Sequence, residues 1–88
     1  MFAVIGKWRV DEKLGSDQLS HITTTVREQP GFVRGYWGRE VEDHTYAHAL
    51  VVLEDEPSAQ ALAAGVLAAI PSAELQVVQV LADASSDS

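Results

Sequence analysis

The stretch that decides the fold is TYAHALVVLE, residues 45–54. Its aromatic, β-branched and aliphatic residues predict a strand, and apolar side chains occupy both the odd and the even positions. The odd positions hold Ala47, Ala49, Val51 and Leu53, and the even ones hold Tyr46, Leu50 and Val52. A strand with one face in water would alternate apolar with polar residues. This strand is therefore expected to be covered on both faces, and residues 75–82 show the same pattern.

Three further strands and two helices are predicted around this stretch. The strands cover residues 2–10, 32–41 and 75–82, and the short polar link at 42–44 makes residues 32–54 a hairpin. The resulting order is strand, helix, strand, strand, helix, strand. On one small chain this order predicts an α+β, ferredoxin-like fold, with a four-stranded antiparallel sheet and both helices on one of its faces.

The first helix is predicted from its cap and its apolar face. Ser16 is a good N-cap after a polar connector at residues 11–15, and the Pro30-Gly31 pair ends the helix. Apolar residues spaced for one helical face are Leu19, Ile22 and Val26. The β-branched run at residues 23–25 lowers helix propensity, so this helix is expected to depend on packing against the sheet.

The second helix is predicted to start at the acidic residues 55–56 with Pro57 in its first turn, and to stop at Pro71. Acidic residues are favourable at the positive end of a helix dipole, and proline is tolerated where the backbone amide needs no helical partner. The predicted buried stripe consists of Ala59, Leu62, Ala63, Val66, Leu67 and Ile70.

Composition limits the classes of partner. The 88 residues predict one domain at 1–82 and a disordered C-terminal tail at 83–88. The 13 acidic against 6 basic residues give a net charge of −7, which disfavours nucleic acid and anionic membrane. No cysteine is present and no run reaches the ~20 apolar residues of a membrane helix. We therefore expect a cytoplasmic protein that does not bind a membrane.

The covered second face of the sheet predicts a homodimer. Two helices can cover one face only, while residues 45–54 and 75–82 are apolar on both. An uncovered apolar face would promote aggregation. A second copy of the same sheet is the simplest cover, so the expected assembly is a dimer that pairs through the face away from the helices.

The chain resembles the antibiotic-biosynthesis-monooxygenase-like group, the dimeric α+β barrels. The similarity spans residues 2–82 and is carried by FAVI at 2–5, QPGFV at 29–33 before the strand with Tyr36 and Trp37, YAHALVV at 46–52, and SAQA at 58–61. The resemblance implies that two sheets pack face to face and that each protomer holds a cavity for a small aromatic substrate. Members include cofactor-free monooxygenases acting on polyketide-type phenols, quinol-type oxygenases and haem-degrading enzymes. The haem-degrading members depend on an asparagine, and this chain contains none.

The candidate site residues lie on the predicted strands. His48 stands among apolar neighbours and can act as a base or orient a substrate, and Arg34 can hold an anionic or enolic oxygen. The expected walls of the substrate site are Trp8, Tyr36, Trp37 and Tyr46. The alternatives are a core histidine with a hydrogen-bond partner, aromatic residues that simply pack, and a solvated arginine. Gly35 and Gly38 around Trp37 indicate either room for a ligand or a bulge.

Neither a metal nor a cofactor is expected. His44 and His48 are four residues apart, which along a strand is ~13 Å and too far to share one ion. His21 is predicted on the polar side of the first helix, opposite its apolar face. The sequence also lacks a glycine-rich phosphate loop and a nucleophile elbow.

Two functions follow as hypotheses. The first is a cofactor-independent monooxygenase, or a related oxidoreductase or isomerase, that acts on a small aromatic or enolisable metabolite. Such an enzyme would hold the substrate in a dry pocket and favour its deprotonated form. The alternative is a non-catalytic dimer that binds a small ligand, which the shortage of polar groups on the inner faces favours.

Overall fold

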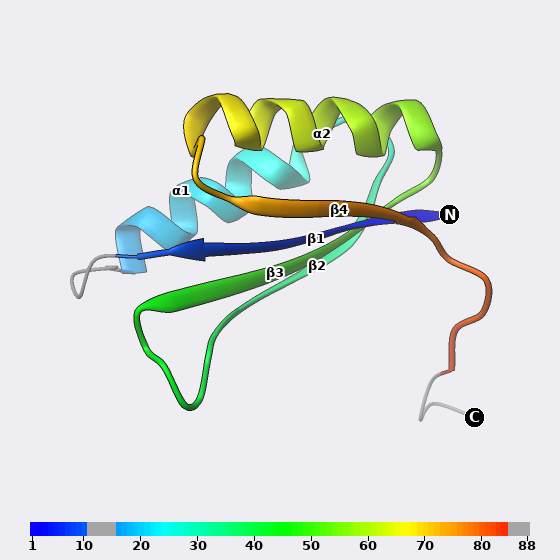
Figure 1. Ribbon diagram of the computed structural model, residues 1–88. Helices are drawn as coiled ribbons and strands as arrows, with labels where there is room; N and C mark the ends of the chain where they lie inside the picture. The colour runs from blue at the N-terminus through cyan, green and yellow to red at the C-terminus, as the bar shows by residue number, and fades with distance from the viewer. Residues whose placement is uncertain (11–15, 85–88) are drawn as a thin grey trace.

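A computed structural model describes residues 1–10 and 16–84 of the chain. The predicted polar connector at 11–15 and residues 85–88 of the predicted tail lie outside this range. The elements follow the predicted βαββαβ order (Figure 1). They are β1 (Phe2–Arg9), α1 (Ser16–Arg27), β2 (Phe32–Arg39), β3 (Tyr46–Leu53), α2 (Glu56–Ala69) and β4 (Glu74–Gln79).

The four strands form one antiparallel sheet in the order β2-β3-β1-β4. Both helices lie on the same face of this sheet (Figure 1). The predicted ferredoxin-like α+β fold is therefore confirmed. The strand β3 lies inside the sheet with hydrogen-bonded neighbours on both sides, which fits the strongly apolar stretch that defines it.

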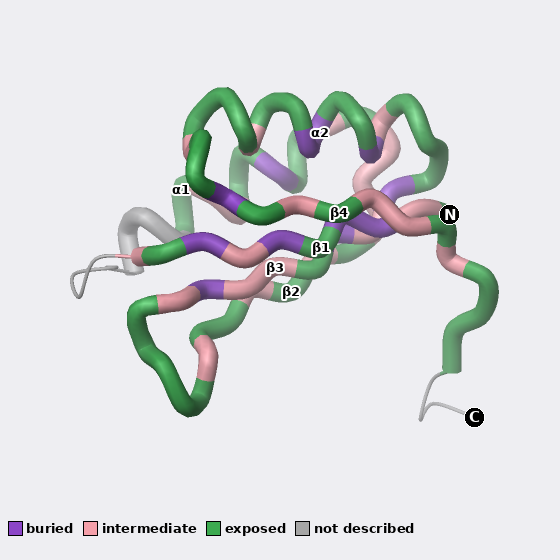
Figure 2. Tube along the Cα trace, viewed as in Figure 1, coloured by how far each residue is buried: buried purple, intermediate pink, exposed green. Residues whose placement is uncertain are grey.

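The register of the strands sorts their residues onto two faces. Val4 of β1 lies opposite Val51 of β3, and Trp8 lies opposite Ala47. These residues face the helices, and because successive strand residues point to opposite sides, their chain neighbours point away. We call the two sides of the sheet the helix face and the open face. The main core lies between the helix face and the two helices, where Figure 2 shows buried segments, and Leu53 at the end of β3 is its fully buried member.

Hydrogen bonds at the ends of the elements explain where these stop. The β2–β3 connection is longer than predicted because Asp43 organises a turn there, accepting from the amide and the hydroxyl of Thr45. Asp55 caps α2 by accepting a hydrogen bond of 2.8 Å from the amide of Ser58, as its predicted start requires. These hydrogen bonds hold the pKa of each aspartate below its usual range.

The turn between α1 and β2 contains a glycine with a positive φ. Gly31 has a φ of +78°, a conformation that suits glycine, and it ends the turn between α1 and β2.

Leu67 is 42% exposed, so its assignment to the buried stripe of α2 was wrong. The buried stripe is narrower than predicted, since the buried residues of α2 are Ala59, Leu62 and Ala63. Among the described residues, no helix has the length and apolar character needed to cross a membrane.

Candidate functional site

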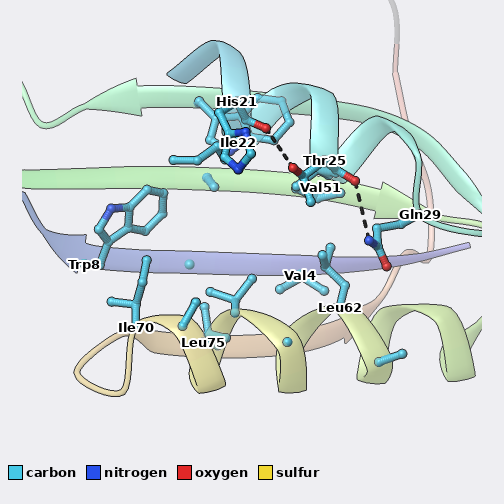
Figure 3. A pocket seen from close by; sticks show the side chains of 18 residues that line it. Val4, Trp8, His21, Ile22, Thr25, Gln29, Val51, Leu62, Ile70 and Leu75 are labelled. Carbon is cyan, nitrogen blue, oxygen red and sulfur yellow. Dashed lines mark hydrogen bonds between the residues drawn. The ribbon is translucent and has the colours of Figure 1, made fainter. Parts of the chain in front are cut away.

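A cavity of about 360 Å³ lies between the helix face of the sheet, α1 and α2 (Figure 3). This volume is at the lower end of the range for small-molecule pockets. Its floor is made of residues from the strands, including Val4, Gly6 and Ala49, and its sides come from the two helices. The cavity opens to solvent where exposed residues of both helices, such as His21 and Gly65, reach its edge.

Two tryptophans line the cavity, and each lies beside the glycine two positions earlier. A Cβ on Gly35 would lie 2.6 Å from Cη2 of Trp37, so the indole lies against the backbone where a side chain would stand. On β1 the pair Gly6 and Trp8 is less close: a Cβ on Gly6 would lie 3.8 Å from Cζ3 of Trp8, an ordinary contact, and 2.8 Å from Cδ2 of Leu75. The Gly-x-Trp spacing at 35–37 is a sequence signal for the close glycine–indole packing, and the sequence prediction did not use it.

Gly35 and Gly38 were predicted to mark either a bulge or room for a ligand beside Trp37, and the structure shows neither at Gly35. The irregularity in β2 lies between Phe32 and Arg34, so the bulge is not at the glycines. The space at Gly35 is filled by the indole of Trp37 and not by a ligand. A Cβ added to Gly38 would meet nothing within 4 Å, and this glycine belongs to the open face, where it pairs with His48.

On the α2 side, small residues keep the cavity wide. Ala61, Gly65 and Ala69 recur every four residues, and all three line the cavity. A Cβ added to Gly65 would meet nothing within 4 Å. Glycine inside a helix is less favourable than alanine by about 1 kcal/mol, and at this position no close packing requires it. The effect of Gly65 is to leave space between the helices.

The polar residues of the cavity come from α1 and the turn directly after it. His21, Thr25 and Gln29 recur every four residues and lie on the α1 side of the cavity (Figure 3). The hydroxyl of Thr25 donates to the carbonyl of His21 at 2.9 Å, and Nε2 of Gln29 donates to the carbonyl of Thr25 at 3.5 Å. Among the described residues that line the cavity, His21 alone carries an ionisable side chain.

The position of His21 corrects our prediction that it lies opposite the apolar face of the first helix. It is exposed, but it lies next to Ile22 at the edge of the sheet-facing side and borders the cavity. The prediction failed because it treated the apolar residues as the whole sheet-facing arc. Where a cavity separates a helix from its sheet, polar residues at the margin of that arc also face inward.

The predicted site residues are divided between the two faces of the sheet. Trp8 and Trp37 line the cavity on the helix face. The open face holds Arg34, Tyr36, Tyr46 and His48. Each of them pairs with a residue of the open face on the neighbouring strand, and alternates along its own strand with residues of the helix face. Tyr36 and Trp37 are consecutive in a strand and so must point to opposite sides. The single site predicted from all six residues therefore does not exist within one copy of the chain.

The two predicted catalytic residues are also far from each other. Arg34 pairs with Val52 and Gly38 pairs with His48, so Arg34 and His48 are separated by four positions along β2. That separation corresponds to about 13 Å between the backbones. The predicted cooperation of a base at His48 with an anion partner at Arg34 is not supported by this placement.

His48 belongs instead to a charged cluster on the open face. Its Nε2 donates to Oε1 of Glu40 at 3.1 Å, and Nζ of Lys7 lies 3.7 Å from the same oxygen. Lys7 and Arg9 stand over the ring of Tyr46, at 4.4 and 5.6 Å from its centroid. The depression beside His48, lined also by Ile5, is shallow and open. The structural alternative, a core histidine hydrogen-bonded to backbone or tyrosine, is wrong in two respects: the His48 side chain is 44% exposed, and its partner is the carboxylate of Glu40.

Comparisons with known proteins add no assignment: no family model matches the chain, and no curated protein matches its sequence. The geometry of the site is therefore the basis for assigning a function. In the described part of the chain, no group of three or more His, Asp or Glu side chains is placed to hold a metal ion.

Proposed function

We propose that the chain binds a small, flat, largely apolar molecule in the cavity between the helices and the sheet. The observation that carries this proposal is the combination of two indoles with open space beside Gly65. Small-molecule sites are concave and mostly apolar, with a few polar groups that fix orientation. The cavity has this composition, since His21 is the only ionisable residue among the described ones that line it.

The placement of the two tryptophans favours a flat occupant. Trp37 pairs with Ala49 of β3, and Trp8 pairs with Ala47 of the same strand. The tryptophans thus stand on strands two spacings apart, about 10 Å, with only alanine side chains on the strand between them. Aromatic rings prefer offset-stacked or edge-to-face contacts. Of these two alanines Ala49 lines the cavity, so an aromatic molecule over Ala49 can make such contacts with the indoles that border the same space.

The variant Gly65→Leu tests the proposal, because it places a large side chain in the open space. Naphthalene is the probe, and its affinity is measured by calorimetric titration. We expect at least a tenfold loss of naphthalene affinity in Gly65→Leu. The matched control is Ala68→Leu, which adds the same side chain to an exposed position of α2 away from the cavity. Equal naphthalene affinity in the two variants, or no binding by the wild type, would contradict the proposal.

We also propose that two copies pair through their open faces. This face exposes Ile5, Tyr36 and Leu50, at 41, 60 and 38% of their surfaces. It carries both signs of charge, with Arg34 on the β2 side and Glu74 on the β4 side. A twofold axis brings a surface onto itself, so such a face can match opposite charges with a second copy.

Light scattering at micromolar concentration tests the pairing, and a dimer has twice the 9.5 kDa mass of the chain. We expect Leu50→Glu to yield the monomer, because it buries a charge in the interface. Leu67→Glu is the control, since Leu67 has a similar exposure, 42%, but lies on α2. A wild-type mass of 9.5 kDa, or monomers from both variants alike, would refute pairing through the open face.

A cofactor-independent oxygenase remains the second candidate, within the antibiotic-biosynthesis-monooxygenase-like group that the sequence resembles. The observation in its favour is the apolar lining of the cavity, because a substrate that covers this lining displaces water from it, and loss of water strengthens electrostatic control of a bound anion. With anthrone, the methylene carbon would lose two hydrogens, one oxygen atom of O₂ would form the carbonyl and the other would leave as water.

Oxygen uptake with anthrone tests this candidate. We expect uptake by the wild type to fall to the uncatalysed rate in Gly65→Leu and to persist in Ala68→Leu. His48→Leu is informative as well, because His48 lies on the open face and pairs with Glu40. Loss of uptake in His48→Leu with naphthalene binding intact would show that the chemistry does not take place in this cavity.

A further inference from the structure

We infer that His21, Thr25 and Gln29 form a subsite that binds a hydroxyl group of the ligand and so fixes the ligand's orientation. This inference rests on the proposed binding function, since it concerns the same cavity. It concerns the class of ligand, which would be a flat apolar body with one hydroxyl at the end that meets α1.

The first support is the one-sided distribution of polar groups. His21 and Thr25 belong to α1 and Gln29 to the turn directly after it, and the spacing of four places the three side chains in a row. The opposite side is apolar, with Leu62 and Ile70 among the lining residues of α2 and its loop, and Figure 3 shows them across the cavity from α1. A ligand with one polar end therefore has one favourable orientation.

The second support is the hydrogen-bonding capacity that remains on this row. The Thr25 hydroxyl uses its hydrogen on the His21 carbonyl, so its oxygen can still accept. Gln29 uses one amide hydrogen on the Thr25 carbonyl, which leaves a second hydrogen and the amide oxygen. The imidazole of His21 has no hydrogen-bond partner among the described residues and offers one donor and one acceptor when neutral. Groups that both donate and accept suit a hydroxyl.

The charges around the cavity favour a neutral hydroxyl over a carboxylate. Among the described lining residues there is neither a lysine nor an arginine that could neutralise a permanent anion. The chain as a whole carries a net charge of −7, which opposes the approach of anions. The neutral imidazole of His21 has one nitrogen that can accept a hydrogen bond, so it can receive the hydroxyl hydrogen of a phenol or enol.

The experiment compares three probes of similar size: naphthalene, 1-naphthol and 1-naphthoate. Their affinities are measured by calorimetric titration for the wild type, His21→Leu and His21→Gln. We expect the preference for 1-naphthol over naphthalene to fall about tenfold in His21→Leu, the loss of one good hydrogen bond. His21→Gln keeps a donor and an acceptor, so it should retain part of the preference. Naphthalene affinity should change less than about threefold in both variants, because neither removes an apolar contact of comparable worth.

The control is His44→Leu, which makes the same exchange at an exposed residue of the β2–β3 connection. It should leave the preference unchanged. A second measurement needs no variant: the imidazole proton resonances of His21 should shift when 1-naphthol is added and stay in place with naphthalene.

Each failure has a separate meaning. If naphthalene does not bind the wild type, the proposed cavity function fails and this inference fails with it. If naphthalene binds and the preference for 1-naphthol survives in His21→Leu with no shift of the His21 resonances, the subsite is refuted while the cavity function stands. If 1-naphthoate loses more affinity than 1-naphthol in His21→Leu, the subsite takes an anion and the assignment to a hydroxyl is wrong.

Discussion

Replacing Gly35 by alanine should destabilise the protein, although the same exchange usually stabilises a chain. A Cβ at this position would lie 2.6 Å from Cη2 and 2.8 Å from Cζ3 of Trp37. Carbon atoms in ordinary contact are about 3.5–4.0 Å apart, so the indole has to move by about 1 Å. Such a movement tilts the indole within the cavity that it lines.

The expected size of the effect follows from two opposing contributions. Overpacking in a core costs about 1–3 kcal/mol, while replacing glycine reduces the entropy of the unfolded chain and stabilises by about 0.4–1 kcal/mol. We expect a net loss of about 1 kcal/mol in the free energy of unfolding, which in a domain of this size lowers Tm by about 4–8 °C. The tilted indole should also lower the affinity for naphthalene.

Urea unfolding followed by circular dichroism measures this effect, and a double-mutant cycle isolates its cause. In a Trp37→Leu background the close contact is gone, so Gly35→Ala should there be neutral or stabilising. The change of sign between the two backgrounds identifies the indole as the source of the cost. Greater stability of Gly35→Ala in the wild-type background would refute the placement of Trp37 over Gly35.

Three further predictions concern α2 and the core. Because the folded state lowers the pKa of Asp55, its carboxylate stabilises the fold above the usual aspartate pKa, and this contribution is lost as the pH falls through the lowered value. The difference in urea midpoint between the wild type and Asp55→Ala should therefore vanish in acid. Asp55→Asn keeps the cap, so its urea midpoint should not differ from that of the wild type. Gly65→Ala should raise the unfolding free energy by about 0.5–1 kcal/mol while weakening naphthalene binding. Leu53→Ala, at a fully buried position, should cost about 2–5 kcal/mol in the same urea assay.

The order of the elements could be predicted from the sequence because local signals and periodicity agree. The caps and breakers, such as Asp55 and the turn at Pro30-Gly31, mark boundaries that the structure keeps to within a few residues. The ends of β2 and β3 were less accurate, since the side chain of Asp43 organises a longer turn than the polar residues alone suggest. Apolar residues at strand ends, such as Val41, gave no sign that pairing had stopped.

The candidate site was harder to predict because it depends on which face each residue occupies. Sequence proximity suggested that Tyr36 and Trp37 act together, and the alternation of a strand sends them to opposite sides. The role of Gly65 was not predicted, because small residues spaced by four along a helix, as at 61, 65 and 69, also occur where two elements pack closely. His21 was dismissed for its polarity, although polarity at the margin of a cavity is what a binding site requires.

The two faces of β3 show how one strand can carry two separate requirements. Its helix-facing side changes along its length: Val51 and Leu53 pack in the core, while the smaller Ala49 lies in the floor of the cavity beside Trp37. Its open-face residues Tyr46 and Leu50 are large, and they give the opposite surface its apolar area and its contacts with cations. Where the cavity begins, the helix face therefore has an alanine at position 49, while its chain neighbour Leu50 on the open face is large. The asymmetry is expected if one face must leave room for a ligand while the other must offer area to a second copy of the sheet.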